Sequence, residues 1–400
     1  MKRKCLAVVI ILLFTGTCII PAIAQDIEKT SQPTSSGNWL YVGGSGPGNY
    51  TRIQDAIDNA STGDTIHVYS GIYNENILIE KTLTLEGENK DTTIINGGKN
   101  TSTISIFNDN VQIMGFTITN SSWNWGAGVT INANHCKITN NVILDCDCFI
   151  RLQSAYENTI ENNNIIRQAQ AWLKYGIKLE HSENNHIIKN NITNIAYSMQ
   201  LEESNGNTIS NNIFTRNQGS IWLIKSHNNS LTENTITLTD DNFCFWIQES
   251  NNNLIMKNYV YDNEGIGIWI LDSQGNRIQE NQINNNLYGM SIEGSIFTLV
   301  KHNEITNNTN YGIYLKTAYV NLITKNNIFD NGQNALFRNA WLNHWWRNYW
   351  KPHFLGPKII KGTIFKVVRH GYGFEEVDIL TLYKCDWHPS HNPYDIAEMS

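Results

Sequence analysis

Two carboxylates and their neighbours are the first residues in this chain whose types and spacing could do chemistry. Glu180 and Glu202 occupy equivalent positions in consecutive repeats, with Lys178 and His181 beside the first of them. Neighbouring strands of a sheet lie about 4.8 Å apart, and carboxyl groups about 5 Å apart are typical of retaining glycosidases. Because like charges raise the pKa of one partner, the pair predicts an acid and a nucleophile. The alternative is that the charges are simply solvated.

Three tryptophans are the second candidate group. Trp222, Trp246 and Trp269 recur at one repeat position, and Arg151 and Tyr314 belong to the same column. An outward ladder of indoles would offer apolar surface to the C–H faces of sugar rings. The residues two positions earlier are small, which predicts a shallow floor on the same face: Ser220, Cys244 and Gly267. The alternative is that the indoles pack on one another and only cover the sheet.

Both groups are positioned by a repeat of about 23 residues between positions 128 and 328. Apolar residues alternate with polar ones, which is the period of strands with one buried face. Three short strands per repeat predict an all-β solenoid, a single-stranded parallel β-helix. A column of Asn at the bend between two strands predicts both left-handed backbone and stacked amides that fix the register. Its members are Asn141, Asn163, Asn190, Asn212, Asn234, Asn258, Asn281, Asn303 and Asn326.

The chain divides into four predicted segments. Residues 1–24 have the basic start, apolar run and small-x-small end of a secretory signal peptide. Residues 25–38 form a polar leader, predicted to be disordered. Residues 39–340 form the β-helix, whose first coil is capped by an amphipathic helix within residues 53–60. Residues 341–400 form a C-terminal capping segment, rich in aromatic residues at its start.

Charge and hydropathy restrict the partners and the location. Removal of the signal peptide takes away three basic residues and changes the net charge from -7 to -10. This balance argues against nucleic acid, because phosphates require a basic surface. No second apolar stretch reaches the length of a membrane span, so we expect no transmembrane anchor after processing. The sequence therefore predicts an exported protein, extracellular or periplasmic and associated with the cell surface.

Cysteine and histidine spacing gives no metal signature. His, Cys and Asp residues gather between positions 135 and 148, but their spacing matches no zinc motif. In an exported chain a disulfide from Cys136 to Cys146 or Cys148 is the better prediction. We therefore predict no metal site and no cofactor, with calcium or copper as open alternatives.

Several segments together resemble a known family. The segments 53–57 and 63–73, the asparagine column and the closing segment 393–396 resemble right-handed parallel β-helix surface proteins. In particular they resemble the NosD-like periplasmic β-helix and the carbohydrate-binding and sugar-hydrolase (CASH) domain repeats, over residues 39–396. The resemblance implies a right-handed, pectin lyase-like fold in which the tryptophan column lies on the first sheet, where polysaccharide lyases carry their substrate groove. The catalytic motifs of polygalacturonases and pectinesterases are absent.

These observations leave three functions open. The leading hypothesis is an exported protein that binds a polysaccharide or cell-surface glycan along the first sheet. If it is an enzyme, it would be a polysaccharide hydrolase or lyase that uses Glu180 and Glu202. The second hypothesis is a structural or adhesive surface protein without catalysis. The third is a periplasmic copper-related protein, as the NosD resemblance implies.

Overall fold

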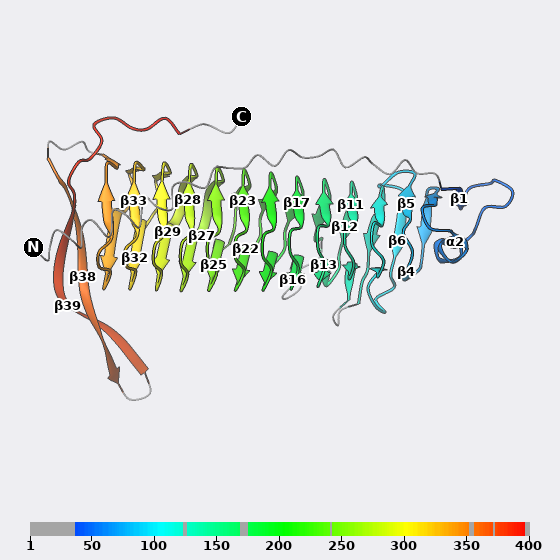
Figure 1. The fold of residues 1–400 in the computed structure, drawn as a ribbon, viewed down its shortest axis with the longest axis horizontal. Coiled ribbons are helices and arrows are strands. Elements are labelled where there is room, and N and C mark those ends of the chain that lie inside the picture. Colours follow the sequence, from blue (N-terminus) through cyan, green and yellow to red (C-terminus); the bar gives the residue numbers. More distant parts are fainter. Residues whose placement is uncertain are drawn as a thin grey trace, which may run out of the picture. The chain divides into compact units, whose positions relative to one another are not determined.

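The structure is a computed structural model that describes residues 37–122, 126–168, 175–240, 242–351, 356–370 and 373–396. The predicted signal peptide and nearly all of the predicted leader lie outside the described residues. From residue 37 onward the chain forms one compact unit. That unit is a stack of coils (Figure 1) in which each turn after the first contributes a strand to each of three ladders.

The first ladder of strands is a parallel sheet of 14 strands, one from each turn. Its members are β1 (Trp39–Val42), β2 (Thr65–Val68), β5 (Thr84–Gly87), β8 (Gln112–Met114), β11 (Lys137–Thr139), β14 (Thr159–Glu161), β17 (His186–Ile188), β20 (Thr208–Ser210), β23 (Ser230–Thr232), β26 (Leu254–Met256), β28 (Arg277–Gln279), β30 (Leu299–Lys301), β33 (Leu322–Thr324) and β36 (His344–Trp346).

The second ladder carries the tryptophan column, and we name it the tryptophan sheet. Its members are β4 (Ile77–Ile79), β7 (Ile104–Ile106), β10 (Ala127–Ile131), β13 (Cys148–Gln153), β16 (Tyr175–Glu180), β19 (Tyr197–Glu202), β22 (Gly219–Ile224), β25 (Phe243–Gln248), the later parts of β27 (Tyr259–Leu271) and β29 (Gln282–Glu293), β32 (Tyr311–Lys316), β35 (Gln333–Arg338) and β38 (Lys358–His370).

The third ladder joins the tryptophan sheet at one corner, because β27 and β29 each run through that corner without a break. Its other members are β3 (Gly71–Tyr73), β6 (Thr93–Asn96), β9 (Thr117–Thr119), β12 (Val142–Leu144), β15 (Asn164–Ile166), β18 (Asn191–Thr193), β21 (Ile213–Thr215), β24 (Thr235–Thr237), β31 (Glu304–Thr306), β34 (Asn327–Phe329) and β37 (Tyr349–Trp350). The predicted all-β parallel β-helix is thus confirmed, with a core of buried Ile, Leu, Val and Phe that runs through the coils.

The predicted asparagine column forms a buried hydrogen-bonded ladder. Asn234, for example, donates from Nδ2 to Oδ1 of Asn258 at 3.0 Å and to the carbonyl of Ile209 at 2.9 Å. Its own Oδ1 accepts both the backbone N–H and the side-chain amide of Asn212, each at 3.0 Å. Each amide therefore satisfies backbone groups of its neighbours, which locks one coil onto the next.

The backbone at this corner differs from the prediction. The ladder asparagines do not have positive φ angles; the exposed or half-buried residue immediately before each of them does, as at Asn140 (φ 54°), Lys189 (55°) and Glu233 (57°). The prediction that the asparagine column supplies the left-handed residue was therefore wrong. The buried position selects Asn for its amide, whereas its exposed neighbour takes the left-handed conformation with several residue types.

Three more polar ladders were not predicted. Two consist of asparagines at other corners: Asn158, Asn185, Asn207, Asn229, Asn253 and Asn276, and then Asn263, Asn286, Asn308 and Asn331. In the third, each serine hydroxyl accepts the N–H of the serine in the preceding coil: Ser182, Ser204, Ser226, Ser250, Ser273 and Ser295. Several corners of the solenoid are thus fixed by side chains as well as by strands.

Both ends of the stack are covered. At the start, α2 (Ile53–Asn59) buries Ile53, Ala56 and Ile57, as the helical-cap prediction requires. The Glu75 carboxylate accepts its first free N–H groups, from Ile53 at 2.9 Å and Gln54 at 3.0 Å.

At the other end the coils continue past residue 340, where Trp345 and Trp350 take core positions and are only 2% exposed. The buried carboxylate of Asp386 accepts the last amide of the asparagine ladder, from Nδ2 of Asn348 at 3.0 Å. An antiparallel hairpin of β38 and β39 (Gly373–Asp386) follows, and Figure 1 shows it extending beyond the stacked coils.

Two further observations concern cysteines and membranes. Cys136 is a free, buried thiol, so the predicted disulfide from Cys136 does not form. Burial raises the pKa of this thiol to about 11. In the described part of the chain, no helix has the length and apolar character needed to cross a bilayer.

Candidate functional site

Strand register places the predicted site residues in two rows on the outward face of the tryptophan sheet. One row pairs Arg151, Lys178, Gln200, Trp222, Trp246, Trp269, Ser291 and Tyr314 across successive strands. In the next row Glu180 pairs directly with Glu202. His181 does not share this face. It follows the end of β16 with φ 49°, and its Nδ1 lies 3.3 Å from a carboxylate oxygen of Glu203.

The three indoles form a close parallel stack. The ring centroids of Trp222 and Trp246 lie 4.6 Å apart with planes inclined by 3°, and those of Trp246 and Trp269 lie 5.0 Å apart with planes inclined by 8°. Rings at this spacing cover one another's faces. The indoles are half-buried, and the stack therefore presents mainly ring edges to solvent, rather than the open ring faces that the sequence suggested.

The predicted floor of small residues is wrong. Ser220 and Cys244 are fully buried, because two consecutive residues of each strand face the interior before the tryptophan turns outward. The outward position is instead three residues before the tryptophan, where Phe243 packs edge-on against Trp246 at 5.0 Å. Gly219 leaves room for that ring, since a Cβ there would approach the Phe243 ring to 3.0 Å.

The same outward position supplies tyrosines that our sequence analysis missed. Tyr197 contacts Tyr175 at 5.6 Å and Trp222 at 6.0 Å between ring centroids. Farther along, Tyr311 contacts Tyr288 at 5.4 Å and Tyr314 at 5.5 Å. The signal was an aromatic residue three positions before members of the known column. With these rings, aromatic contacts run unbroken through five consecutive turns from Tyr175 to Trp269.

At one end of the aromatic row, Glu180 lies in a cluster of charges. Its carboxylate oxygens contact Nε of Arg151 at 2.6 Å and Nζ of Lys178 at 2.7 Å. Nζ of Lys178 also lies 3.6 Å from Glu202. Burial by itself raises the pKa of Glu180, but the hydrogen bonds from Arg151 and Lys178 outweigh it and the pKa is lowered. This direction is opposite to the one that a general acid requires.

The other end of the row is bounded by the hairpin. Arg338 contacts Asp378 of β39 at 2.6 Å, and Lys316 contacts Glu376 at 2.7 Å. Burial is the main cause that raises the pKa of Tyr314, against the opposing effect of its hydrogen bond with Arg338. The face therefore runs from the Glu180 cluster to the acidic side of β39.

These ladders and the continuous outward face define a class of protein, the right-handed parallel β-helix repeat proteins. The family model described as "right handed beta helix region" matches residues 175–329. The model described as "periplasmic copper-binding protein (NosD)" matches residues 57–237. The described coils therefore form a parallel β-helix, and residues 57–237 of the chain are similar to NosD.

Comparisons with individual proteins give one relative in sequence and several proteins with a similar fold. A cell surface glycoprotein of Methanothermus fervidus is 43% identical over 98 residues, which span 24% of this chain and 16% of that protein. The A-module of the Azotobacter vinelandii mannuronan C-5 epimerase has a TM-score of 0.59 at 15% identity, covering 73% of this chain and 94% of that one. A mannuronic acid specific polysaccharide family 6 lyase from human gut microbiota has a TM-score of 0.58 at 14% identity, covering 78% and 86%. At such identities the likeness to the two enzymes is one of fold.

The family description raises the question of copper. Among the described residues, no group of three or more His, Cys, Asp and Glu side chains could hold a metal ion. We therefore assign no copper site.

Proposed function

We propose that this is an exported, cell-surface protein that binds polysaccharide along the outward face of the tryptophan sheet. The observation that carries the proposal is the unbroken aromatic contact from Tyr175 to Trp269 in five consecutive turns. The solenoid already buries its core inside the coils, so this half-exposed aromatic row is additional to what the fold needs. Contiguous exposed apolar surface of this kind is typical of an interaction site.

The geometry suits an extended polymer. A chain laid along the stack of coils would meet one aromatic side chain per turn, about every 4.8 Å. The indole edges and the tyrosine rings offer apolar contacts to sugar C–H groups, and the phenol hydroxyls offer hydrogen bonds. The charged cluster of Arg151, Lys178 and Glu180 would contact the polymer at one end of the row.

The contacts of Glu180 make it a poor candidate for the proton donor of a glycosidase. A retaining glycosidase needs one carboxyl group with a raised pKa to donate a proton, and the pKa of Glu180 is lowered. Both oxygens of this carboxylate are held by cations at 2.6 and 2.7 Å. We therefore propose positioning roles for Glu180 and Lys178, and we propose Trp222, Trp246 and Trp269 as the main contacts.

The test is a binding assay with a panel of acidic and neutral polysaccharides, read by retardation in polymer-containing gels and by product sizing. Trp246→Ala removes the middle indole and should weaken binding at least tenfold, which corresponds to about 1.4 kcal/mol. Trp246→Phe should lose less, because it keeps a ring. Trp39→Ala, at an exposed position on a different sheet, is the matched control and should bind like the wild type.

Three outcomes would contradict the proposal. Equal binding by wild type and Trp246→Ala would show that the polysaccharide does not bind on this face. Absence of binding to the entire panel would favour a structural surface protein. Shortened polymer chains that vanish in Glu202→Ala would establish an enzyme instead of a binding protein.

A further inference from the structure

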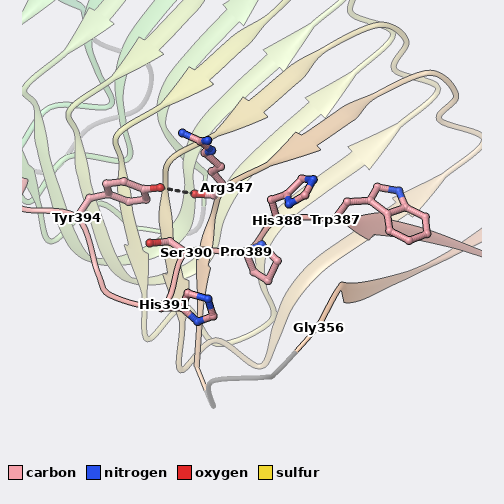
Figure 2. A pocket seen from close by; sticks show the side chains of 8 residues that line it. All are labelled: Arg347, Gly356, Trp387, His388, Pro389, Ser390, His391 and Tyr394. Carbon is pink, nitrogen blue, oxygen red and sulfur yellow. Dashed lines mark hydrogen bonds between the residues drawn. The ribbon is translucent and has the colours of Figure 1, made fainter.

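A cavity lies outside the tryptophan sheet, where the C-terminal segment returns to the last coils. Its volume is about 440 Å³, within the range of small-molecule sites. Arg347, His388 and His391 line it together with Trp387, Ser390 and Tyr394. In Figure 2, Tyr394 and Trp387 lie at opposite ends of this group of residues.

The chemistry of the lining is basic and aromatic. The chain as a whole has a net charge of -7, yet among the described residues that line this cavity there is no Asp or Glu. The carboxylate of Asp386 is fully buried, and its oxygens accept the backbone N–H groups of Arg347 and Asn348 and the indole N–H of Trp350. These hydrogen bonds hold the Asp386 carboxylate at the end of the asparagine ladder.

Arg347 has no counter-charge within the described residues. Its guanidinium lies over the ring of Trp346, 5.9 Å from the ring centroid. Guanidinium groups bind oxyanions through paired N–H donors, and among the described residues no carboxylate forms an ion pair with this one. This donor is therefore available for an anionic ligand.

The backbone of the lining segment is held in place before any ligand binds. The Tyr394 hydroxyl donates to the carbonyl of Arg347 at 2.7 Å (Figure 2). The backbone of Tyr394 exchanges two hydrogen bonds with the Asn327 side chain, at 2.8 and 2.9 Å. Ser390 N–H donates to the carbonyl of Asn348 at 2.9 Å. A lining tied at three points to the last coils loses little freedom when it binds.

We propose that this cavity binds a sugar ring that carries an anionic substituent. Arg347 would pair with the oxyanion, the imidazole of His388 would add a hydrogen-bond donor, and the exposed indole of Trp387 would stack on the ring. Trp387 is 64% exposed, so unlike the stacked indoles it has ring surface to offer. The inference rests on the proposed function only for the choice of a sugar; the anion preference comes from the lining itself.

Calorimetric titration of the full chain with four sugars of one parent ring tests the proposal. The probes are galactose, galacturonate, galactose 6-sulfate and galactose 6-phosphate, with inorganic sulfate as an anion without a ring. At least one acidic sugar should bind at least tenfold more tightly than both galactose and inorganic sulfate. The acidic sugar that binds best identifies the oxyanion.

Variants then test whether the sugar binds in this cavity. Arg347→Gln and Trp387→Ala should each weaken the acidic sugar at least tenfold, whereas Arg216→Gln should not. Arg216 is a matched control, because it too is an arginine with positive φ and is exposed at a corner. Equal affinity for galactose would overturn the anion preference, and equal affinity for inorganic sulfate would overturn the role of the ring.

The same variants separate this inference from the proposed function. The Trp246→Ala variant should lose binding of the polysaccharide but keep binding of the acidic monosaccharide. If Trp246→Ala loses the monosaccharide and Arg347→Gln keeps it, the ligand lies on the tryptophan sheet and the cavity proposal is overturned. If no sugar binds at all, the cavity proposal is overturned whatever happens at the tryptophan sheet.

Discussion

At the scale of single residues, this protein separates two tasks that one corner of a coil must perform. The buried Asn provides an amide that bonds to three neighbouring groups or more, and the exposed residue before it provides the left-handed turn. Glu233 and Asn234 show the division: the first has φ 57° and the second is fully buried. Substitution should therefore have very different consequences at the two positions.

Asn234→Ala should destabilise the solenoid by about 2–4 kcal/mol, because it leaves the buried N–H of Asn212 and the carbonyl of Ile209 without partners. Glu233→Asn should change the stability little, since Asn tolerates positive φ. Native-state hydrogen exchange of the flanking coils is the appropriate measurement, because long repeat arrays need not unfold in two states. Equal protection in the two variants would contradict the ladder's role.

The charges at Glu180 predict a pH dependence. Since its pKa is lowered in the folded protein, its contribution to stability is present above the pKa of the unfolded carboxyl group and is lost as the pH falls through the folded value. Glu180→Gln should therefore destabilise the protein at pH 7 by about 1–3 kcal/mol. The two proteins should converge in acid. Urea unfolding across this pH range measures the difference, and a gap that stays constant down to low pH would contradict it.

At the scale of elements, the strands were predictable and the orientation of some side chains was not. Period-two alternation is a local property, so it correctly located the paired positions of Trp222, Trp246 and Trp269. The two consecutive inward residues in strands such as β22 break that alternation. For this reason the alternation pattern predicts Ser220 on the outward face and does not indicate Tyr197 there. Ring stacking also could not be foreseen, because spacing alone does not fix the tilt of an indole.

The hairpin is the element whose placement depends most on side-chain charges. Besides its strand pairing with β35 at Gly362 and Thr363, it is held by the contacts of Asp378 and Glu376 with Arg338 and Lys316. Asp378→Asn combined with Glu376→Gln should increase amide exchange in β39 several-fold and leave the coils unchanged. Glu233→Gln, at an exposed corner of the coils, is the control. Unaltered exchange in the double variant would mean that backbone pairing alone holds the hairpin.

At the scale of the whole described unit, the repeats give the tryptophan sheet many equivalent positions. The ends of the stack carry features that occur only once. The face of the tryptophan sheet suits a polymer because its aromatic residues recur with every turn. The cavity near Arg347 suits a single residue of a ligand because it is built only once. This cavity could not be predicted from sequence, since it depends on contacts such as Tyr394 with Asn327, which are 67 positions apart.

The most direct test of the central claim is oxidative footprinting of the aromatic side chains with and without a polysaccharide that binds. We predict protection of Tyr197, Trp222, Trp246 and Trp269, with Trp39 on the fourteen-stranded sheet oxidised equally in both samples. Protection confined to Trp39 or to the hairpin, while the tryptophan sheet reacts as in the free protein, would contradict the account.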